Sequence, residues 1–259
     1  MDAEHIKRYW TERAAGDASA QSTTQDVYLR EIEYRGLRDK IEEYSPKTVV
    51  DLGCGDGRTT ARLARDFNTI GFTGIDYAAS MIENATRLAA EKGISNLTLV
   101  NADVMHPLPI IKADLIFTTR CLINIPSWKS QKIAIKNIHA ALSSRGIFIM
   151  VENFTEGQNN FNRLRKEYSL PEIPVRDHNL FFNDKLFKKF ITSYFNIIEN
   201  VNISSTYYIV TRIIYSSLCQ EKGEPPDYFD KHHELASRLP FAGNFGPVRM
   251  LCLQKKDIS

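Results

Sequence analysis

The stretch Val49-Val50-Asp51-Leu52-Gly53-Cys54-Gly55-Asp56-Gly57-Arg58 decides how the rest of the chain is interpreted. It starts as a short apolar run, typical of a buried strand, and passes through three alternate glycines into a helix-like stretch from Thr59 to Phe67. Glycine adopts positive φ and lets the backbone approach a ligand closely. A turn of this kind, at the carboxyl end of the first strand of a parallel sheet, binds nucleotide-like ligands in open α/β folds.

Length and composition predict an ordinary globular protein. The 259 residues are 43% hydrophobic and 25% charged, which fits a single domain over 1–259. The net charge of +2 favours neither nucleic acid nor an anionic membrane as partner. No apolar run reaches the roughly 18 residues of a membrane span. Because Met1 to Arg13 lacks an apolar signal core, we expect a cytoplasmic protein. The four cysteines form no C-x-x-C pair, so we expect no metal site.

Strand-like and helix-like stretches alternate after the first turn. Strands are expected at 48–52, 69–75, 97–100, 114–118 and 146–151, and helices at 59–67, 80–92 and 127–142. This rhythm predicts an α/β fold with a doubly wound, mostly parallel sheet and right-handed crossovers. A further amphipathic helix precedes it and ends before Pro46.

Four regions follow from this pattern. We expect an N-terminal helical cap at 1–44, a ligand-binding core at 45–152, and two long excursions at 153–182 and 204–245. The excursions exceed ordinary connections between a strand and a helix. They are interpreted as lids over a substrate site, because such loops commonly carry specificity. The alternative is that they only fill out the structure.

Acidic residues at successive strand ends narrow the choice of ligand. A dinucleotide site prefers G-x-G-x-x-G, but here Arg58 stands at the third glycine position. Asp51 precedes the turn and would repel a pyrophosphate, yet it could hold an ammonium group. Asp76, about 25 residues further on, can accept hydrogen bonds from both ribose hydroxyls. Asp103 could accept one from an adenine amino group. Together these acids describe a cationic adenosine ligand without phosphates.

Four motifs resemble those of class I S-adenosylmethionine-dependent methyltransferases. They are Val49 to Gly57, then Gly74-Ile75-Asp76-Tyr77-Ala78-Ala79-Ser80-Met81, Asn101-Ala102-Asp103-Val104, and Ala113 to Phe117 with Thr118-Thr119-Arg120. The match runs from about Val49 to Glu152 in the correct order and spacing. It implies S-adenosyl-L-methionine as cofactor and S-adenosyl-L-homocysteine as product. It also implies a seven-stranded, Rossmann-like sheet, with final strands at 195–201 and 249–254 and the last strand antiparallel.

The resemblance assigns cofactor contacts to Asp51, Gly53, Cys54, Gly55, Gly57, Asp76, Tyr77, Met81, Asn101, Ala102, Asp103, Val104 and Arg120. The glycines would border the methionine part, with Cys54 as a small residue tolerated in their turn. Asp51 would support the ammonium, Asp76 the ribose, and Asp103 with Val104 the adenine. Tyr77 and Met81 would pack on the adenosine, or would be ordinary core contacts. Arg120 would lie near the methionyl group.

Candidate bases occur where the chain leaves the carboxyl edge of the sheet. Methyl transfer from a sulfonium is an in-line displacement, and it needs a base only when the acceptor is protonated. Glu152, Glu156 and His178 are the predicted catalytic residues. Two alternatives stay open: Glu152 could cap a helix or pair with an arginine, and His178 could be a structural group.

The acceptor is less well defined than the cofactor. Segments 151–157 and 176–179 resemble parts of small-molecule methyltransferases, some of them in glycan or natural-product pathways. We expect a small-molecule or glycan-precursor acceptor, methylated at oxygen. Basic residues at Arg163, Arg165, Lys166 and Arg176 suggest an anionic acceptor, or an ordinary solvated surface.

Other classes of function stay open as alternatives. After the fourth strand comes Thr118-Thr119-Arg120-Cys121, not the Asn/Asp-Pro-Pro-aromatic run of nucleic-acid methyltransferases, so we expect no nucleic-acid partner. We also expect no membrane partner. A nicotinamide-dependent oxidoreductase and a non-catalytic S-adenosylmethionine-binding module are the alternatives. The oligomeric state is left open.

Overall fold

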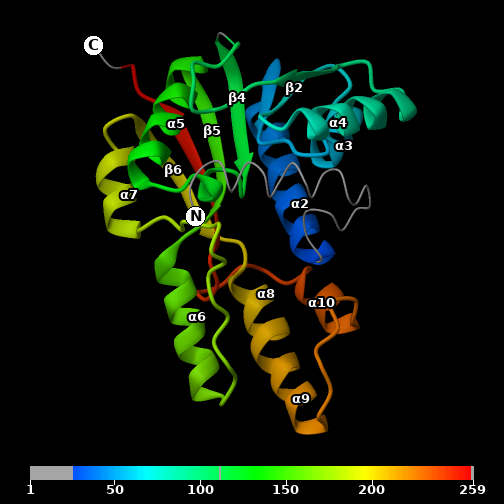
Figure 1. Ribbon diagram of the computed structural model, residues 1–259, viewed down its shortest axis with the longest axis vertical. Coiled ribbons are helices and arrows are strands. Elements are labelled where there is room, and N and C mark those ends of the chain that lie inside the picture. Colours follow the sequence, from blue (N-terminus) through cyan, green and yellow to red (C-terminus); the bar gives the residue numbers. More distant parts are fainter. Residues whose placement is uncertain (1–25, 111, 258–259) are drawn as a thin grey trace.

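A computed structural model describes residues 26–110 and 112–257 (Figure 1). Sequence predictions about residues 1–25 lie outside these residues. The helices are α2 (Val27–Tyr44), α3 (Arg58–Asp66), α4 (Ala79–Glu91), α5 (Trp128–Ala141), α6 (Thr155–Glu167), α7 (Asp184–Ile191), α8 (Ser205–Ile209), α9 (Tyr215–Lys222) and α10 (Lys231–Ala236). Two short turns are the 3-10 helix η1 (Leu122–Asn124) and the π-helix η2 (Val210–Ile214).

One seven-stranded sheet organises the molecule. Its strands are β1 (Thr48–Leu52), β2 (Gly71–Asp76), β3 (Leu97–Asn101), β4 (Ala113–Thr119), β5 (Leu142–Asn153), β6 (Phe195–Asn202) and β7 (Val248–Lys255). They lie in the order β3-β2-β1-β4-β5-β7-β6. Strands β1 to β5 pair in parallel, whereas β7 is antiparallel to both of its neighbours. The predicted α/β fold, with a mostly parallel seven-stranded sheet and an antiparallel last strand, is confirmed.

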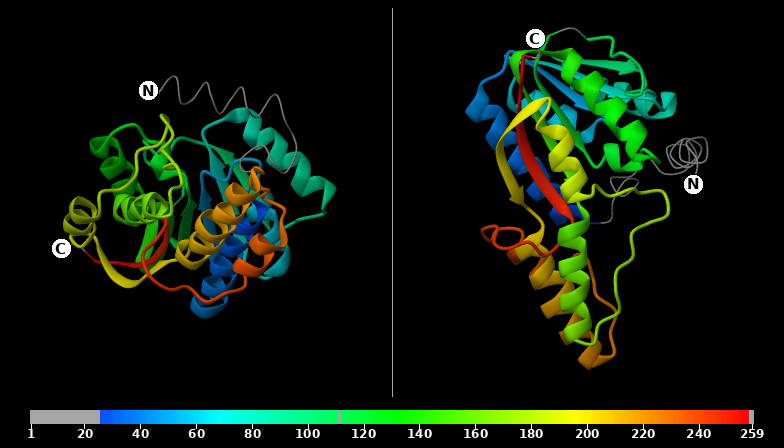
Figure 2. Two further views of the ribbon diagram at one scale, coloured as in Figure 1. Left: turned by 90° about the horizontal axis from the view of Figure 1, so that it is seen from below. Right: turned by 90° about the vertical axis from the view of Figure 1, so that its left-hand side faces the viewer.

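Each face of the sheet carries its own core. Helices α2 and α3 cover one face, where Leu37 of α2 and Leu63 of α3 pack with Val49 and Phe117. Helices α5 and α7 cover the other face, together with side chains that alternate with the first set along the strands. Figure 2 shows the sheet between these two layers. Burial on both faces explains why the strands read as continuous apolar runs rather than as alternating patterns.

The two long excursions form a lobe beyond the sheet. Helices α6, α8, α9 and α10 extend below the carboxyl ends of the parallel strands, away from α4 and α5 (Figures 1 and 2). Phe161, Leu170 and Ile213 make a small core between α6 and η2. The lobe therefore stands at the edge where the glycine turn lies. Whether it closes over a substrate, as the predicted domain boundaries imply, stays a prediction.

Strand β5 is longer than the 146–151 expected from sequence. Its pairing with β4 starts at Leu142 opposite Ala113, and its pairing with β7 runs to Asn153 opposite Val248. Extra length at both ends thus comes from partners far away in the chain. Among the described residues, no helix is long and apolar enough to cross a membrane.

Close backbone contact fixes α6 to the last loop. A Cβ atom added at Gly157 would lie 2.1 Å from the carbonyl oxygen of Gly246, and the Gly246 N–H donates to the Gly157 carbonyl at 2.9 Å. We predict that Gly157→Ala lowers the free energy of unfolding by about 1–3 kcal/mol through overpacking, although alanine is the better helix former. Urea denaturation measures this. Gly71→Ala is the control, because its added Cβ would meet only an oxygen at 3.8 Å; equal stability of both variants would contradict the packing argument.

Candidate active site

The glycine turn adopts the conformation that its sequence requires. Gly53, Gly55 and Gly57 have φ of 75°, 55° and 72°. The N–H groups of Gly53 and Cys54 donate to the carbonyl of Ile75 at 2.7 and 3.0 Å, which joins the turn to the end of β2. Helix α3 starts directly after Gly57. The predicted order of strand, turn and helix is present, and the turn lies at the carboxyl edge of the sheet.

Space as well as φ selects glycine in this turn. A Cβ atom at Gly53 would lie 2.4 Å from the Cys121 Sγ, and one at Gly57 would lie 2.7 Å from the Cβ of Ala85 in α4. Both distances are far below van der Waals contact. The turn is therefore clamped between the chain that follows β4 and helix α4, and a larger residue at either position would displace it.

Asp76 ties three strand ends together. Its carboxylate accepts from the Gly55 N–H at 3.0 Å and from the Ala78 N–H at 2.9 Å. Its backbone carbonyl accepts from the Asn101 side chain at 2.9 Å and from the Ala102 N–H at 3.1 Å. Asn101 and Ala102 thus act on the site by fixing the end of β2. Each carboxylate oxygen has two lone pairs, so Asp76 can accept further bonds from a ligand.

The three strand-end acids crowd one another. Asp51 is buried, accepts from the Thr60 hydroxyl at 2.5 Å, and has its pKa raised to about 7 by burial, with repulsion from Asp76 adding to it. Burial also raises the pKa of Asp76, and repulsion from Asp103 contributes. Asp103 itself accepts from the Met105 N–H at 2.9 Å. Such a group of acids favours a cation over an anion.

Apolar residues of the predicted cofactor set lie around these acids. Met81 and Ala78 are buried and pack with the half-buried Tyr77 at the start of α4. Val104 packs against the core beneath β3 and β4. Cys54 is buried beside β2, where a Cβ at Gly74 would lie 3.1 Å from its Sγ. A flat adenosine surface would find apolar side chains here next to polar groups that can hold its ribose.

Arg120 reaches the site from the end of β4. Its backbone has a φ of 51°, which is left-handed and uncommon for arginine. Its guanidinium pairs with Glu33 of α2 at 3.0 Å, and the Glu33 side chain is only 2% exposed. The next residue, Cys121, packs against Gly53. Arg120 therefore lies beside the glycine turn, and its predicted place near the methionyl group of the cofactor stays a prediction.

Glu152 occupies the position predicted for a base, but backbone groups surround its carboxylate. It is fully buried and accepts from the N–H groups of Cys121, Leu122 and Ile123 at 3.0, 2.9 and 3.3 Å. Burial raises its pKa to about 7, while these hydrogen bonds lower it. The contacts match the capping alternative, because Glu152 satisfies the exposed N–H groups of η1.

The other two predicted bases lie on α6 and on the segment that returns from it. Glu156, in the first turn of α6, is mostly exposed and pairs with Arg249 of β7 at 3.3 Å. His178 is half-buried in the extended segment that returns from α6. Its neighbours Asn179 and Leu180 bond to Asn124 and Ile123 at 3.0 and 2.7 Å, so this segment runs along η1. Their catalytic roles stay predictions.

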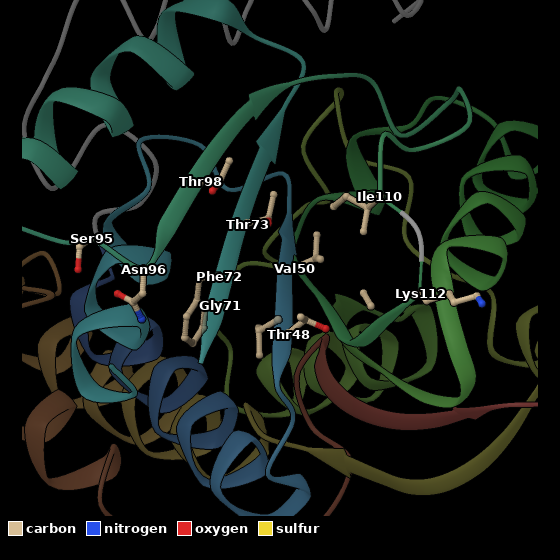
Figure 3. Close-up of a pocket in the computed structure, with 12 residues that line it drawn as sticks. Thr48, Val50, Gly71, Phe72, Thr73, Ser95, Asn96, Thr98, Ile110 and Lys112 are labelled. Carbon is tan, nitrogen blue, oxygen red and sulfur yellow. The ribbon is translucent and has the colours of Figure 1, made fainter. Parts of the chain in front are cut away.

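A pocket of about 360 Å³ lies elsewhere in the molecule. Thr48, Gly71, Thr73, Asn96, Thr98 and Lys112 are among the residues that line it, in the amino-terminal halves of the strands (Figure 3). The connection from β3 to β4, which contributes Ile110 and Lys112, carries no helix among its described residues. None of the predicted cofactor residues lines the pocket. It is therefore separate from the glycine turn.

Known proteins are similar to this chain in sequence and in structure. Residues 44–211 match the model of a family described as a methyltransferase domain. The chain belongs to this family. The match covers α3 to α8 and all of the strands up to β6, and it confirms the resemblance seen in the motifs.

Curated relatives are similar over part of their length. A trans-aconitate 2-methyltransferase of Pseudomonas paraeruginosa is 42% identical over 64 residues, 25% of this chain and 23% of that protein. A malonyl-[acyl-carrier protein] O-methyltransferase of Paenibacillus is 27% identical over 172 residues, 63% of this chain and 59% of that protein. The chain thus spans less than two thirds of the curated relatives that it matches.

A solved structure shows the same fold at low sequence identity. The magnesium protoporphyrin IX methyltransferase of Synechocystis, solved with bound S-adenosylhomocysteine, superposes with a TM-score of 0.60 at 16% identity. The superposition covers 98% of this chain and 96% of that one. The lobe beyond the sheet is therefore included in the shared architecture.

Several residues of the site were not predicted from sequence. They include Thr60, which bonds Asp51, Cys121, which packs on the turn, and Glu33, which pairs with Arg120. Glu33 had a detectable signal, because it stands four residues after Leu29 and four before Leu37, on the apolar face of α2. For Thr60 and Cys121 we find no signal of this kind.

The buried acids predict a pH dependence. A carboxyl whose folded pKa is raised binds a proton that the unfolded chain has lost, so stability falls as pH rises from the unfolded to the folded pKa. For Glu152 this window runs from 4.5 to about 7. We predict that Glu152→Gln removes up to about 1.4 kcal/mol per pH unit from the slope of unfolding free energy against pH. Urea titrations between pH 5 and 7 measure it. Exposed Glu167→Gln should keep the wild-type slope; a wild-type slope in Glu152→Gln would contradict the assignment.

Proposed function

We propose that this chain is an S-adenosylmethionine-dependent methyltransferase acting on a small-molecule acceptor. The observation that carries the proposal is the group of three acids, Asp51, Asp76 and Asp103, around a left-handed glycine turn. These carboxyls repel one another and two of them are buried, which suits a ligand with positive charge and hydroxyl donors. Membership of the methyltransferase family supports the same ligand.

Each predicted residue would contact one part of the cofactor. Asp76 would accept from the ribose hydroxyls, and Asp103 with Val104 would border the adenine. Asp51 and the Gly53–Gly57 turn would hold the methionine part, with Arg120 near its carboxylate. Tyr77 and Met81 would pack against the adenosine. Bound S-adenosylmethionine supplies an electrophilic methyl group on a sulfonium.

A nicotinamide cofactor fits this site less well. Its pyrophosphate would place two negative charges against the buried Asp51 and Asp76, and the desolvated site would strengthen that repulsion. The turn also lacks the third glycine, since Arg58 occupies its position. Turnover distinguishes an enzyme from the remaining alternative, a module that binds S-adenosylmethionine without catalysis.

The protein's contribution to the reaction is positioning. In-line displacement requires the acceptor to approach along one direction with water kept out, and holding the two reactants correctly lowers the barrier substantially. Glu152 would serve by fixing η1, which holds Cys121 against the turn. Glu156 is paired with Arg249, so His178 remains the candidate base for an acceptor that carries a proton.

We further propose that the acceptor is anionic and is methylated at oxygen. Trans-aconitate and a malonyl group, named in two relatives, both carry carboxyl groups. A carboxylate is deprotonated at neutral pH and needs no base. The basic residues first considered for this role do not gather at the turn. Arg165 is buried and donates to the backbone carbonyls of Pro171 and Arg212, so its role is structural.

Calorimetry tests the cofactor assignment. Wild-type protein should bind one equivalent of S-adenosylhomocysteine. Asp76→Ala should weaken binding at least about a hundredfold, because it removes two hydrogen bonds to a charged group, each worth about 1.5–3 kcal/mol. Asp39→Ala is the matched control, since Asp39 lies exposed on α2 far from the turn. Undiminished binding by Asp76→Ala would exclude the ribose role. Stabilisation by NAD and not by S-adenosylhomocysteine would favour the oxidoreductase.

A further inference from the structure

We propose that Tyr208 and Arg212 form the acceptor-binding half of the site and recognise a carboxylate of the acceptor. The inference rests on the proposed function and adds the residues that select the substrate. Both side chains come from the lobe beyond the sheet. They lie in the segment 204–245, which the sequence analysis predicted only as a long excursion. Their contacts connect the lobe to the glycine turn through Arg120.

A π-helical turn sets the direction of Arg212. Helices α8 and α9 are continuous with η2 between them, and such turns are frequent at functional sites. The altered backbone bonding is compensated by neighbours. The Thr211 hydroxyl donates to the Tyr207 carbonyl at 2.7 Å, and Arg165 of α6 donates to the Arg212 carbonyl. One of these hydrogen bonds comes from η2 itself and the other from α6, so the π-helical turn is stabilised by its packing in the lobe.

The guanidinium of Arg212 lies over an aromatic ring. Its central carbon lies 4.2 Å from the centre of the Tyr208 ring and 5.4 Å from that of Tyr228. It pairs with Asp26, the N-cap residue of α2, and donates to the Thr211 hydroxyl at 2.9 Å. The guanidinium of arginine has five N–H donors, so these two bonds leave other N–H groups of Arg212 that can donate to an anion.

Tyr208 links this arginine to the glycine turn. Its hydroxyl makes no hydrogen bond within residues 26–110 and 112–257, although Phe161 packs on its ring at 5.2 Å. Burial and the charge of Asp26 raise its pKa, while the charges of Arg212 and Arg120 lower it. A ligand placed there would meet one hydroxyl donor and two guanidinium groups, each already paired with a carboxylate, Arg120 with Glu33 and Arg212 with Asp26.

Two further atoms beside Arg120 lack partners. Its own Nε and the Oε1 of Glu33 are buried without a hydrogen bond in the described part of the chain. Burial, with repulsion from Arg120 and Arg58, lowers the pKa of Arg30 on the same helix as Glu33. Unsatisfied donors and crowded arginines are costly in a buried site unless a polar ligand completes them. An anionic ligand would satisfy the Arg120 Nε, and the methionine carboxylate assigned to Arg120 above is one such anion, whereas the Glu33 Oε1 requires a donor.

A planar carboxylate fits this set better than a neutral oxygen acceptor. Guanidinium groups bind carboxylates through paired, parallel hydrogen bonds, and the Tyr208 hydroxyl adds a donor. Methylation of a carboxylate needs no general base, which agrees with the engagement of Glu152 by backbone N–H groups and of Glu156 by Arg249. In the transfer, a carboxylate oxygen bonds to the methyl carbon as the carbon–sulfur bond breaks. The sulfur keeps the electron pair, so an ester and a neutral thioether result.

Kinetics with matched acceptors test the proposal. The probes are trans-aconitate, malonate and benzoate, each against its amide, and the readouts are S-adenosylhomocysteine release and binding to protein loaded with S-adenosylhomocysteine. We expect at least one acid, and no amide, to bind and be methylated. Tyr208→Phe should raise the acceptor KM about tenfold, with kcat within about twofold, since a hydrogen bond to a charged group is lost. Its affinity for S-adenosylhomocysteine should be unchanged.

Two further variants complete the design. Arg212→Lys keeps a charge for Asp26 but loses the fork, so its KM should rise at least as much. Tyr168→Phe, an exposed tyrosine at the end of α6, is the control. Amides accepted as well as acids, an unchanged KM in Tyr208→Phe, or no acid bound by loaded wild-type protein would each overturn the inference while leaving the proposed function intact. Wild-type protein that binds no S-adenosylhomocysteine would overturn the proposed function, and this inference with it.

Discussion

The hydrogen bond from the Gly55 N–H to the Asp76 carboxylate is the contact on which the site depends. It joins the end of β2 to a turn whose three glycines occupy left-handed conformations. The turn in turn fixes the start of α3, and its closeness to Cys121 and Ala85 leaves it no room to shift. Because Asp76 is buried beside other acids, the same carboxylate that shapes the turn also creates a demand for positive charge. Structure and ligand preference therefore have one origin.

Much of the fold could be predicted because its signals are local. Apolar runs, glycine after a strand, and helical periodicity all lie within a few residues, and β1 was located to the residue. The length of β5 was underestimated, since its ends are extended by pairing with β4 and β7. The π-helical turn Val210–Ile214 was not anticipated either. The Arg212 carbonyl in this turn accepts a hydrogen bond from Arg165 of α6, and no local sequence pattern predicts such a long-range contact.

The site divides in the same way. The common placement of Asp51, Asp76 and the glycines was predictable, because each lies at or just after the end of a strand and parallel strands end at one edge. The environment of Glu152 was not, because its partners at Cys121 to Ile123 are about 30 residues away. A glutamate at a strand end has the same sequence signature whether it faces a substrate or caps a turn. Only three-dimensional placement distinguishes these roles.

This division separates cofactor from acceptor along the chain. The cofactor half is built from backbone turns at the sheet edge, where local sequence fixes geometry. The acceptor half that we propose depends on side chains that meet across the lobe, such as Arg212 with Asp26 of α2. Helix α2 joins the halves, since Glu33 on the same helix pairs with Arg120 beside the turn. Lobe residues can therefore diverge while the turn is kept. Acceptor specificity then has to be sought at the contacts between lobe and α2, not in the motifs that identify the family.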